Sequence, residues 1–265
     1  SILAAFGCKI TVVEMLPHLL GGMDRSLADA VARQFTDAGI QVELGARVKS
    51  VCDQGMEQAV VFEKNGAEGT VSAEYVLVSA GRKANSAGLG CEELGIRMER
   101  GFIQVDSHMR TSVPGIYAAG DITGQGMLAH TASEGGVVAV ENMAGIDREL
   151  RLNAVPKVVF VDKEVASVGM TREEAERAGM DVVTGTFSLA GNGKSLAMGK
   201  NQGFVTVVAD REHHAILGLH MMGPCASELV ALGTQMIASE LLVEDVECAI
   251  YPHPAVAEAI REACL

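Results

Sequence analysis

The sequence predicts a mixed α/β and α+β protein, in which an α/β unit carrying a β-meander is followed by a domain with one antiparallel sheet. Three observations support this fold class. Strand and helix patterns alternate in residues 8–44, and short strands joined by turns fill residues 41–81. From Val155 onward, strands mix with helices without regular βαβ alternation. We find no internal repeat and no low-complexity segment.

Composition narrows the classes of function. The chain of 265 residues is 48% hydrophobic, which favours one large or two ordinary folded domains over disorder. The formal net charge is −13 and no long Lys/Arg run occurs, so nucleic acid and anionic membrane surfaces are disfavoured as partners. No apolar run approaches the roughly 18 residues that a membrane span needs.

The cysteines are widely spaced and none forms a CxxC pair, so neither zinc-finger ligation nor a local redox pair is expected. We expect no metal site, and dispersed buried thiols in a reducing compartment, which favours a cytoplasmic protein. His213 and His214, beside strand residues, are expected to be exposed rather than to bind a metal. The six cysteines are Cys8, Cys52, Cys91, Cys225, Cys248 and Cys264.

A helix end, a strand and a second helix open the α/β unit. Residues 1–7 (SILAAFG) have the character of a helix that Gly7 stops, and residues 8–14 (CKITVVE) predict a buried strand ending at Glu14. Residues 23–40 have apolar side chains at helical spacing and end near a glycine. Those positions are Leu27, Val31 and Phe35, with Gly39 as the stop.

A β-meander follows. Residues 41–51, 58–64 and 68–81 predict short strands, and Asn65-Gly66 between the last two is a strong hairpin signal. A nucleotide-binding α/β unit begins with a strand, a glycine-rich turn and a helix, whereas this chain begins inside that helix. We therefore expect the sequence to be the C-terminal piece of a longer protein.

The remaining elements fall into two regions. Residues 81–153 form a glycine-rich connection, with a strand expected at 116–120 (IYAAG) and an alanine- and valine-rich helix at 131–144. The last region predicts an α+β domain. Its expected strands lie within 155–169, 182–189, 203–210 and 214–223, and its expected helices are 171–179, 226–241 and 254–263.

Two acidic residues follow expected strands. A carboxylate at the position of Glu14 accepts hydrogen bonds from a ribose diol and repels a 2′-phosphate, which favours NAD over NADP; an ordinary strand-end glutamate is the alternative. Asp121 follows the strand 116–120 and precedes a helix starting near Met127. Its carboxylate can bond a sugar-like hydroxyl, and the helix N-terminus offers N–H groups to an electron-rich ligand edge. A simple aspartate cap is the alternative there.

Residues 251–258 read YPHPAVAE. Pro252 and Pro254 restrict the backbone on both sides of His253 and so fix the direction of its ring. A carboxylate hydrogen-bonded to that ring, for which Glu258 is placed, gives a histidine the basicity and the defined tautomer of a general acid–base. The alternative is a histidine at the boundary of a helix that begins with Pro254.

Five stretches together resemble the pyridine nucleotide–disulfide oxidoreductases, across essentially the whole chain and in the family's order. The resemblance is greatest to members that oxidise dihydrolipoamide. Gly-Asp followed by MLAH is a specific signal, and the His-Pro-x-x-x-Glu ending is more specific. The stretches are KITVVE, VLVSAGRKANSAGLG, GIYAAGDITGQGMLAHTASEGG, VPKVVFVDKEVASVGMTREEA and YPHPAVAEA.

The resemblance implies three regions and two cofactors. Residues 1–80 would be an incomplete, Rossmann-like NAD domain with the β-meander, residues 81–152 a segment that completes the FAD site, and residues 153–265 an α+β dimerisation domain of a homodimer. The implied reaction is the FAD-dependent oxidation of dihydrolipoamide with NAD⁺ as acceptor, with a 2-oxo acid dehydrogenase complex as a further partner.

The resemblance also implies roles for single residues. Glu14, Gly81 and Val48 would border NAD, and Arg82 follows Gly81 in the matching motif without an assigned contact. On the FAD side, Asp121 would bind the ribityl chain and the residues after Gly126 would line the flavin. This FAD set is Gly120, Asp121, Met127, Leu128, Ala129 and His130.

At the C-terminal end, the resemblance implies catalysis across the dimer. His253, oriented by Glu258, would serve a redox disulfide of the other subunit, taking a proton from the incoming dithiol and returning one to the departing thiolate. We expect the His253–Pro254 peptide bond to be cis, an option open mainly to X–Pro bonds.

Two departures from the family matter. Ala255-Val256-Ala257 stands where the family commonly has Thr-Leu-Ser; the spacing of the dyad is kept, but the substrate is less certain to be the family's. The family's redox cysteine pair and first glycine-rich FAD motif do not occur in this sequence. We therefore expect that this chain alone does not catalyse the reaction and binds little flavin.

Alternatives remain within and outside the enzyme class. Glu14 speaks against NADP-dependent members such as glutathione reductase, and the absence of a vicinal cysteine pair near Cys264 speaks against mercuric reductase. A soluble transhydrogenase remains open. From another class, the chain could act as a non-catalytic dimerisation and binding module.

Overall fold

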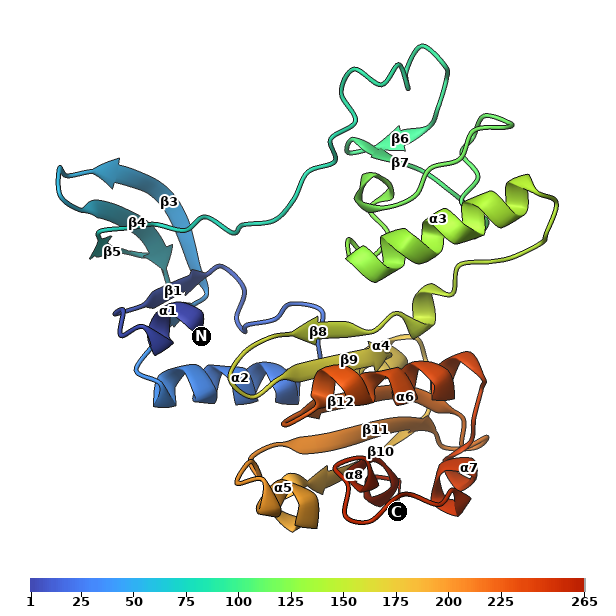
Figure 1. Ribbon diagram of the computed structural model, residues 1–265. Helices are drawn as coiled ribbons and strands as arrows, with labels where there is room; N and C mark the ends of the chain where they lie inside the picture. The colour runs from blue at the N-terminus through green and yellow to red at the C-terminus, as the bar shows by residue number, and fades with distance from the viewer. Residues whose placement is uncertain (265) are drawn as a thin grey trace. The chain divides into compact units, whose positions relative to one another are not determined.

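The chain folds into two compact units. In this computed structural model, which describes residues 1–264 (Figure 1), the first unit comprises Ser1–Val78 and the chain from Pro156 onward, and the second comprises Ser79–Val155. Among the helices of the described residues, none combines the length and the hydropathy required to cross a bilayer.

The first unit opens with the predicted helix, strand and helix. Helix α1 (Ile2–Ala5) ends before Gly7, whose φ is +82°. Strand β1 (Thr11–Glu14) pairs in parallel with β2 (Gln41–Leu44), and α2 (Arg25–Asp37) connects them. The order of these elements is confirmed, although β1 is half-buried rather than buried.

The predicted meander is present as an antiparallel sheet in the order β3-β4-β5. Its strands are β3 (Ala46–Asp53), β4 (Gln58–Lys64) and β5 (Ala67–Ala73). Asn65 and Gly66 both have positive φ, +54° and +77°, and they form the turn between β4 and β5. This is the two-residue hairpin that an Asn-Gly pair predicts.

Two meander strands differ from the prediction. The segment 41–51 is broken at Gly45, whose φ of +65° separates β2 from β3. The segment 68–81 stops being a strand at Ala73, and the apolar side chains of Tyr75 and Leu77 are exposed. A strand needs a neighbour for its N–H and C=O groups, and within residues 1–264 none pairs with this stretch.

The last region forms one five-stranded sheet, as predicted, with every neighbouring pair antiparallel. Its order is β10-β11-β12-β9-β8, so β9 returns beside β12 rather than beside β10. The strands are β8 (Lys157–Val159), β9 (Val165–Gly169), β10 (Val182–Ser188), β11 (Phe204–Asp210) and β12 (Ile216–Met222).

Helices pack against this sheet. Helix α6 lies on β9 and β12, and α8 lies on β10 and β11 (Figure 1). The predicted helix 226–241 ends at Ala238, the predicted helix 254–263 begins only at Glu258, and two short helices were not predicted. The helices are α4 (Arg172–Arg177), α5 (Gly193–Ala197), α6 (Ala226–Ala238), α7 (Val243–Cys248) and α8 (Glu258–Glu262).

One apolar cluster joins the two ends of the first unit. Leu27 and Val31, which the helical spacing marks as the buried face of α2, are fully buried against Val165 of β9 and Met222 of β12. Asp24 caps α2 by accepting a hydrogen bond from the Ser26 backbone N–H at 2.9 Å. The N-terminal segment and the C-terminal sheet therefore share a core.

The second unit holds few regular elements. The helix predicted at 131–144 is present as α3, two residues earlier. The strand predicted at 116–120 is absent: among the described residues only Tyr117 forms a bridge, with Arg110. The elements are β6 (Met98–Glu99), β7 (Phe102–Ile103), the 3₁₀ turns η1 (Asp121–Thr123) and η2 (Leu152–Ala154), and α3 (Ala129–Met143).

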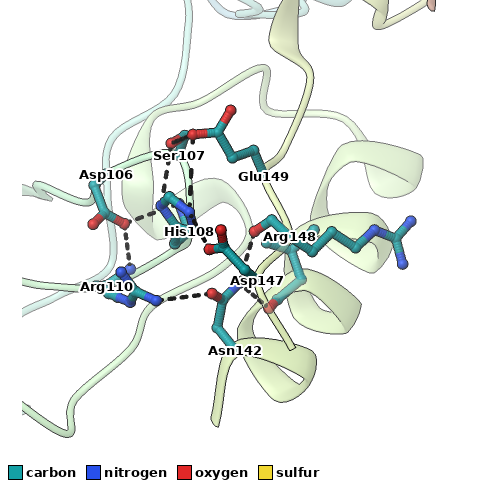
Figure 2. A network of polar contacts seen from close by, with 9 residues as sticks. Asp106, Ser107, His108, Arg110, Asn142, Asp147, Arg148 and Glu149 are labelled. Atoms are coloured by element: carbon teal, nitrogen blue, oxygen red, sulfur yellow. Dashed lines mark hydrogen bonds and ion pairs between the residues drawn. The ribbon is translucent and has the colours of Figure 1, made fainter. Parts of the chain in front are cut away.

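A polar network fixes the C-terminal end of α3 (Figure 2). His108 Nε2 lies 2.9 Å from Asp147 Oδ1, and Arg110 donates to Asn142 Oδ1 at 3.0 Å. Asn142, buried in α3, donates in turn to the carbonyl of Arg148 at 2.7 Å. These contacts join the loop that carries His108 to the helix end, so they hold the direction of α3 within this unit.

The prediction of buried cysteines was wrong for four of the six. Cys91 is buried and Cys264 is half-buried, but the others are exposed free thiols. Cys52 lies on β3, which is exposed beyond its first residue, and Cys225 occupies a positive-φ position directly before α6. The exposed thiols are Cys8, Cys52, Cys225 and Cys248.

Candidate functional site

The predicted histidine–carboxylate pair is formed. His253 Nδ1 lies 2.9 Å from Glu258 Oε1, and the other carboxylate oxygen, Oε2, accepts a hydrogen bond from the backbone N–H of Ala255 at 2.8 Å. Glu258 is the first residue of α8, and the His253–Pro254 peptide bond is cis, as predicted. The short loop between the two prolines and the helix therefore brings both side chains together.

The electrostatics of the pair define its tautomer. The hydrogen bonds from the Ala255 N–H and then from His253 lower the pKa of Glu258 below its ordinary value. A carboxylate only accepts hydrogen bonds, so Nδ1 of His253 carries the proton and Nε2 of the neutral ring is left as a base. The His253 side chain is 79% exposed, whereas that of Glu258 is 26% exposed. The arrangement can take up and return a proton at Nε2.

Close packing places the helix that carries Glu258. Val256 and Ile260 are buried beneath the loop and α8. At Gly185 of β10, a Cβ atom would lie 1.9 Å from the carbonyl oxygen of Ala263, at the end of α8. The missing side chain therefore allows the helix end to rest directly on the strand.

A second predicted group lies in the second unit, around a cavity of about 420 Å³. Asp121 begins η1 after Gly120, whose φ is +87°, and its Oδ2 accepts a hydrogen bond from Arg82 at 3.0 Å. The sequence left the contact of Arg82 unassigned. A basic residue next to a motif glycine was the available signal, but its partner is 39 positions away. The lining residues are Arg82, Lys83, Ala84, Asn85, Asp121, Ile122 and Met127.

The start of α3 adds polar groups to this region. Leu128 occupies the N-cap position and no side chain caps the helix there; Ala129 and His130 begin the helix itself. The buried atoms Thr131 Oγ1 and Gln125 Oε1 have no hydrogen-bond partner among residues 1–264. Buried polar atoms usually have partners, so these two indicate a ligand or water at this end of α3.

The residues predicted to border NAD are described in separate units. In the first, Glu14 ends β1 and its Oε1 accepts a hydrogen bond from the Leu16 backbone N–H at 2.7 Å, while Val48 is exposed on β3. In the second, Gly81 has a φ of +119°, a conformation that side chains rarely adopt.

His213 and His214 are exposed, as predicted, but both have carboxylate partners that the sequence did not indicate. His213 Nδ1 lies 3.0 Å from Asp210 Oδ1, and His214 pairs with Glu244 of α7. The pairing with Glu244 raises the pKa of His214. Nothing among residues 1–264 groups three or more His, Cys, Asp or Glu side chains as a metal site.

A buried histidine was also missed. His220 of β12 is fully buried, with Nδ1 2.7 Å from the Ser167 hydroxyl and Nε2 3.0 Å from the Met170 carbonyl. Burial lowers the pKa of His220, so the ring is neutral: Nε2 donates to the carbonyl and Nδ1 accepts from the hydroxyl. Gly218 makes room for this contact, since a Cβ there would lie 2.1 Å from the same carbonyl oxygen.

Comparison with known proteins assigns the class. The chain belongs to the pyridine nucleotide-disulphide oxidoreductase family, whose description matches residues 1–136, while the family's dimerisation domain matches residues 155–264. The resemblance inferred from the motifs is thereby confirmed.

Relatives within the family narrow the likeness further. A dihydrolipoyl dehydrogenase of Geobacillus stearothermophilus is 38% identical over 261 residues, covering 98% of this chain and 56% of the relative. One from Chlamydia muridarum is also 38% identical, over 266 residues, covering 100% of this chain and 56% of that relative. The chain thus spans little more than half the length of these relatives.

Solved structures show the same fold. LpdA from Mycobacterium tuberculosis superposes with a TM-score of 0.90 at 29% identity, covering 98% of this chain and 57% of that chain. The HOCl-induced flavoprotein disulfide reductase RclA from Escherichia coli, solved as a Cu(II) complex, gives 0.87 at 26% identity, with 100% and 60% covered.

Proposed function

We propose that this chain is the C-terminal portion of a dihydrolipoyl dehydrogenase, which oxidises dihydrolipoamide with NAD⁺ as acceptor and FAD as the bound cofactor. The observation that carries the proposal is the His253–Glu258 pair: an exposed imidazole with its Nδ1 bound to a carboxylate, leaving Nε2 as a base. The names of the dihydrolipoyl dehydrogenases that match nearly the whole chain support the same activity.

Residues of the second unit fit FAD. Asp121 would accept hydrogen bonds from the ribityl hydroxyls, and Met127 to His130 would line the flavin. The unpartnered buried atoms of Gln125 and Thr131 and the uncapped start of α3 favour a polar ligand at that point. When bound, FAD supplies electron transfer between the thiol–disulfide couple and the nicotinamide.

NAD would be bordered by Glu14, Val48 and Gly81. The carboxylate of Glu14 at the end of β1 suits a ribose diol and disfavours a 2′-phosphate, which supports NAD over NADP. We assign residues 1–80 to an incomplete Rossmann-like NAD domain, 81–152 to the segment that completes the FAD site, and 153–265 to dimerisation.

The chemistry assigned to His253 is proton transfer. Oxidising a dithiol to a disulfide releases two electrons and two protons, and NAD⁺ takes up both electrons and one proton as hydride. His253 Nε2 would accept a proton from the incoming dithiol, and Glu258 would stabilise the protonated ring through Nδ1. In the proposed homodimer, the histidine of one subunit serves the disulfide of the other. Ile250, three residues before His253 and 99% exposed, supports an apolar contact with a partner there.

The experiment uses the product of the complete gene. We expect flavin absorbance and dihydrolipoamide-dependent formation of NADH, and we expect His253→Gln to lower kcat by about 10²–10⁴-fold. His213→Gln is the matched control, because His213 is also an exposed histidine beside a carboxylate. Undiminished turnover in His253→Gln would contradict the assigned role, and a flavin-free protein without turnover would contradict the function itself.

A second candidate is reduction of another disulfide within the same family. The fold likeness to the flavoprotein disulfide reductase RclA and the replacement of Thr-Leu-Ser by residues 255–257 favour including it. Parallel assays with NADH and oxidised lipoamide, glutathione or cystine would separate the two. Light scattering tests the homodimer, and a monomer at tens of micromolar would count against it.

A further inference from the structure

A buried asparagine lies behind the catalytic loop. Asn192, 4% exposed, occupies the N-cap position of α5, and its Oδ1 accepts hydrogen bonds from both the backbone N–H and the hydroxyl of Ser195, each at 2.9 Å. Ser195 is fully buried. Because a backbone N–H can only donate, the atom that faces it must be the amide oxygen, and this fixes the orientation of the Asn192 amide.

The other half of that amide points to the loop. With Oδ1 held by Ser195, Nδ2 of Asn192 donates to the carbonyl oxygen of Ala255 at 2.9 Å, across 63 positions of sequence. Ala255 is thus fixed on both sides, since its own N–H donates to Glu258 Oε2. The remaining oxygen of Glu258 meets the ring of His253.

We propose that Asn192 is a positioning residue for His253, acting through the Ala255 backbone and the Glu258 carboxylate. The side chains of Ala255 and Ala257 carry no hydrogen-bonding group, so they cannot supply this restraint themselves. The inference rests on the proposed function of His253 as the acid–base, and it adds the residue that sets the ring's orientation and tautomer.

The role predicts a spectroscopic signature that a merely structural residue would not change. At a pH of about 9, above the ordinary titration range of imidazole, the neutral His253 ring should be predominantly protonated at Nδ1. Long-range proton–nitrogen NMR distinguishes this form from the Nε2–H form, and the His253 signals are assigned by their loss in His253→Gln. The measurement needs neither cofactor nor substrate and uses the 265-residue chain.

The main variant is Asn192→Asp. It keeps an oxygen to accept from Ser195 but loses the donor to the Ala255 carbonyl and places a charge beside it. We expect loss of the Nδ1–H majority. Asn192→Ser, which offers a smaller acceptor and likewise no amide donor, serves if the aspartate variant does not fold. Ser188→Ala is the matched control, because it removes another side-chain hydrogen bond in the preceding turn without a link to Ala255.

The outcomes separate this inference from the proposed function. An unchanged His253 tautomer in a folded Asn192→Asp or Asn192→Ser chain overturns the positioning role, whatever the activity. A shift in either variant with none in Ser188→Ala supports it. In the complete gene product, Asn192→Asp should then lower kcat while leaving the KM for NAD⁺ unchanged. If that protein oxidises no dithiol, the proposed function fails while the NMR result still decides the role of Asn192.

Discussion

Gly185 of β10 permits the close approach of α8, and replacing it tests how that helix is held. Its φ is not positive, so an alanine there is opposed by packing alone. The new Cβ would lie 1.9 Å from the Ala263 carbonyl oxygen, while real Cβ atoms essentially never come within 3.0 Å of a neighbour. The end of α8 must therefore move by about 1.1 Å, the difference of these two distances, and backbone cannot yield as a flexible side chain would.

Overpacking of this kind costs about 1–3 kcal/mol of unfolding free energy. For a unit of this size, each 1 kcal/mol shifts Tm by about 2–4 °C, so we expect Gly185→Ala to melt about 2–12 °C lower than the wild type. Differential scanning calorimetry measures the shift directly. The displacement also loosens the helix that carries Glu258, so the His253–Glu258 hydrogen bond should weaken in the same variant.

Gly193→Ala is the matched control. Gly193 is exposed in the first turn of α5, and a Cβ there would meet nothing within 4 Å. Because alanine is the better helix former, by about 0.5–1 kcal/mol, this variant should melt at or slightly above the wild-type temperature. A Gly185→Ala protein that melts no lower than Gly193→Ala would refute the steric argument.

Three further predictions follow from the same structure. Leu219→Ala empties a fully buried position and should cost about 2–5 kcal/mol in urea unfolding, whereas Leu219→Met should cost less than about 1.5; equal costs would count against tight packing there. Burial lowers the pKa of His220, so the unfolded chain binds a proton that the folded chain does not once the pH falls below about 6.5. Stability should hold above that pH and decline below it, by up to about 1.4 kcal/mol per pH unit, and a decline of the same steepness in His220→Leu would rule out this origin. Burial raises the pKa of Cys264 to about 11, so at pH 8 about one thiol in 10³ is ionised. Iodoacetamide should label exposed Cys52 well before Cys264, which mass spectrometry of the peptides checks; equal labelling would argue against the burial of Cys264.

Local patterns in the sequence predicted much of the fold. The spacing of Leu27 and Val31 marks the buried face of α2, and Asn65-Gly66 specifies the β4–β5 turn. The His253–Glu258 pair was predictable for the same reason, because five residues and two prolines separate or flank its members. In each case the interacting groups lie close in sequence.

Contacts between distant segments were not predictable in this way. Arg82–Asp121, Ser167–His220 and Asn192–Ala255 join residues 39, 53 and 63 positions apart, and they depend on strand register and helix placement that local spacing does not determine. The false strand prediction around Tyr75 has a related cause. Apolar alternation shows that a segment suits a sheet, but a strand also needs a neighbour to pair with.

The way Glu258 is held has a consequence for how this protein can diverge. One of its oxygens binds the main chain of residue 255, a group that every amino acid except proline carries. Exchanges of side chains at positions 255 and 257 can therefore accumulate without disturbing the dyad. An insertion or deletion of a single residue there would shift the carboxylate away from the ring. In this loop, selection acts on length more strongly than on chemical identity.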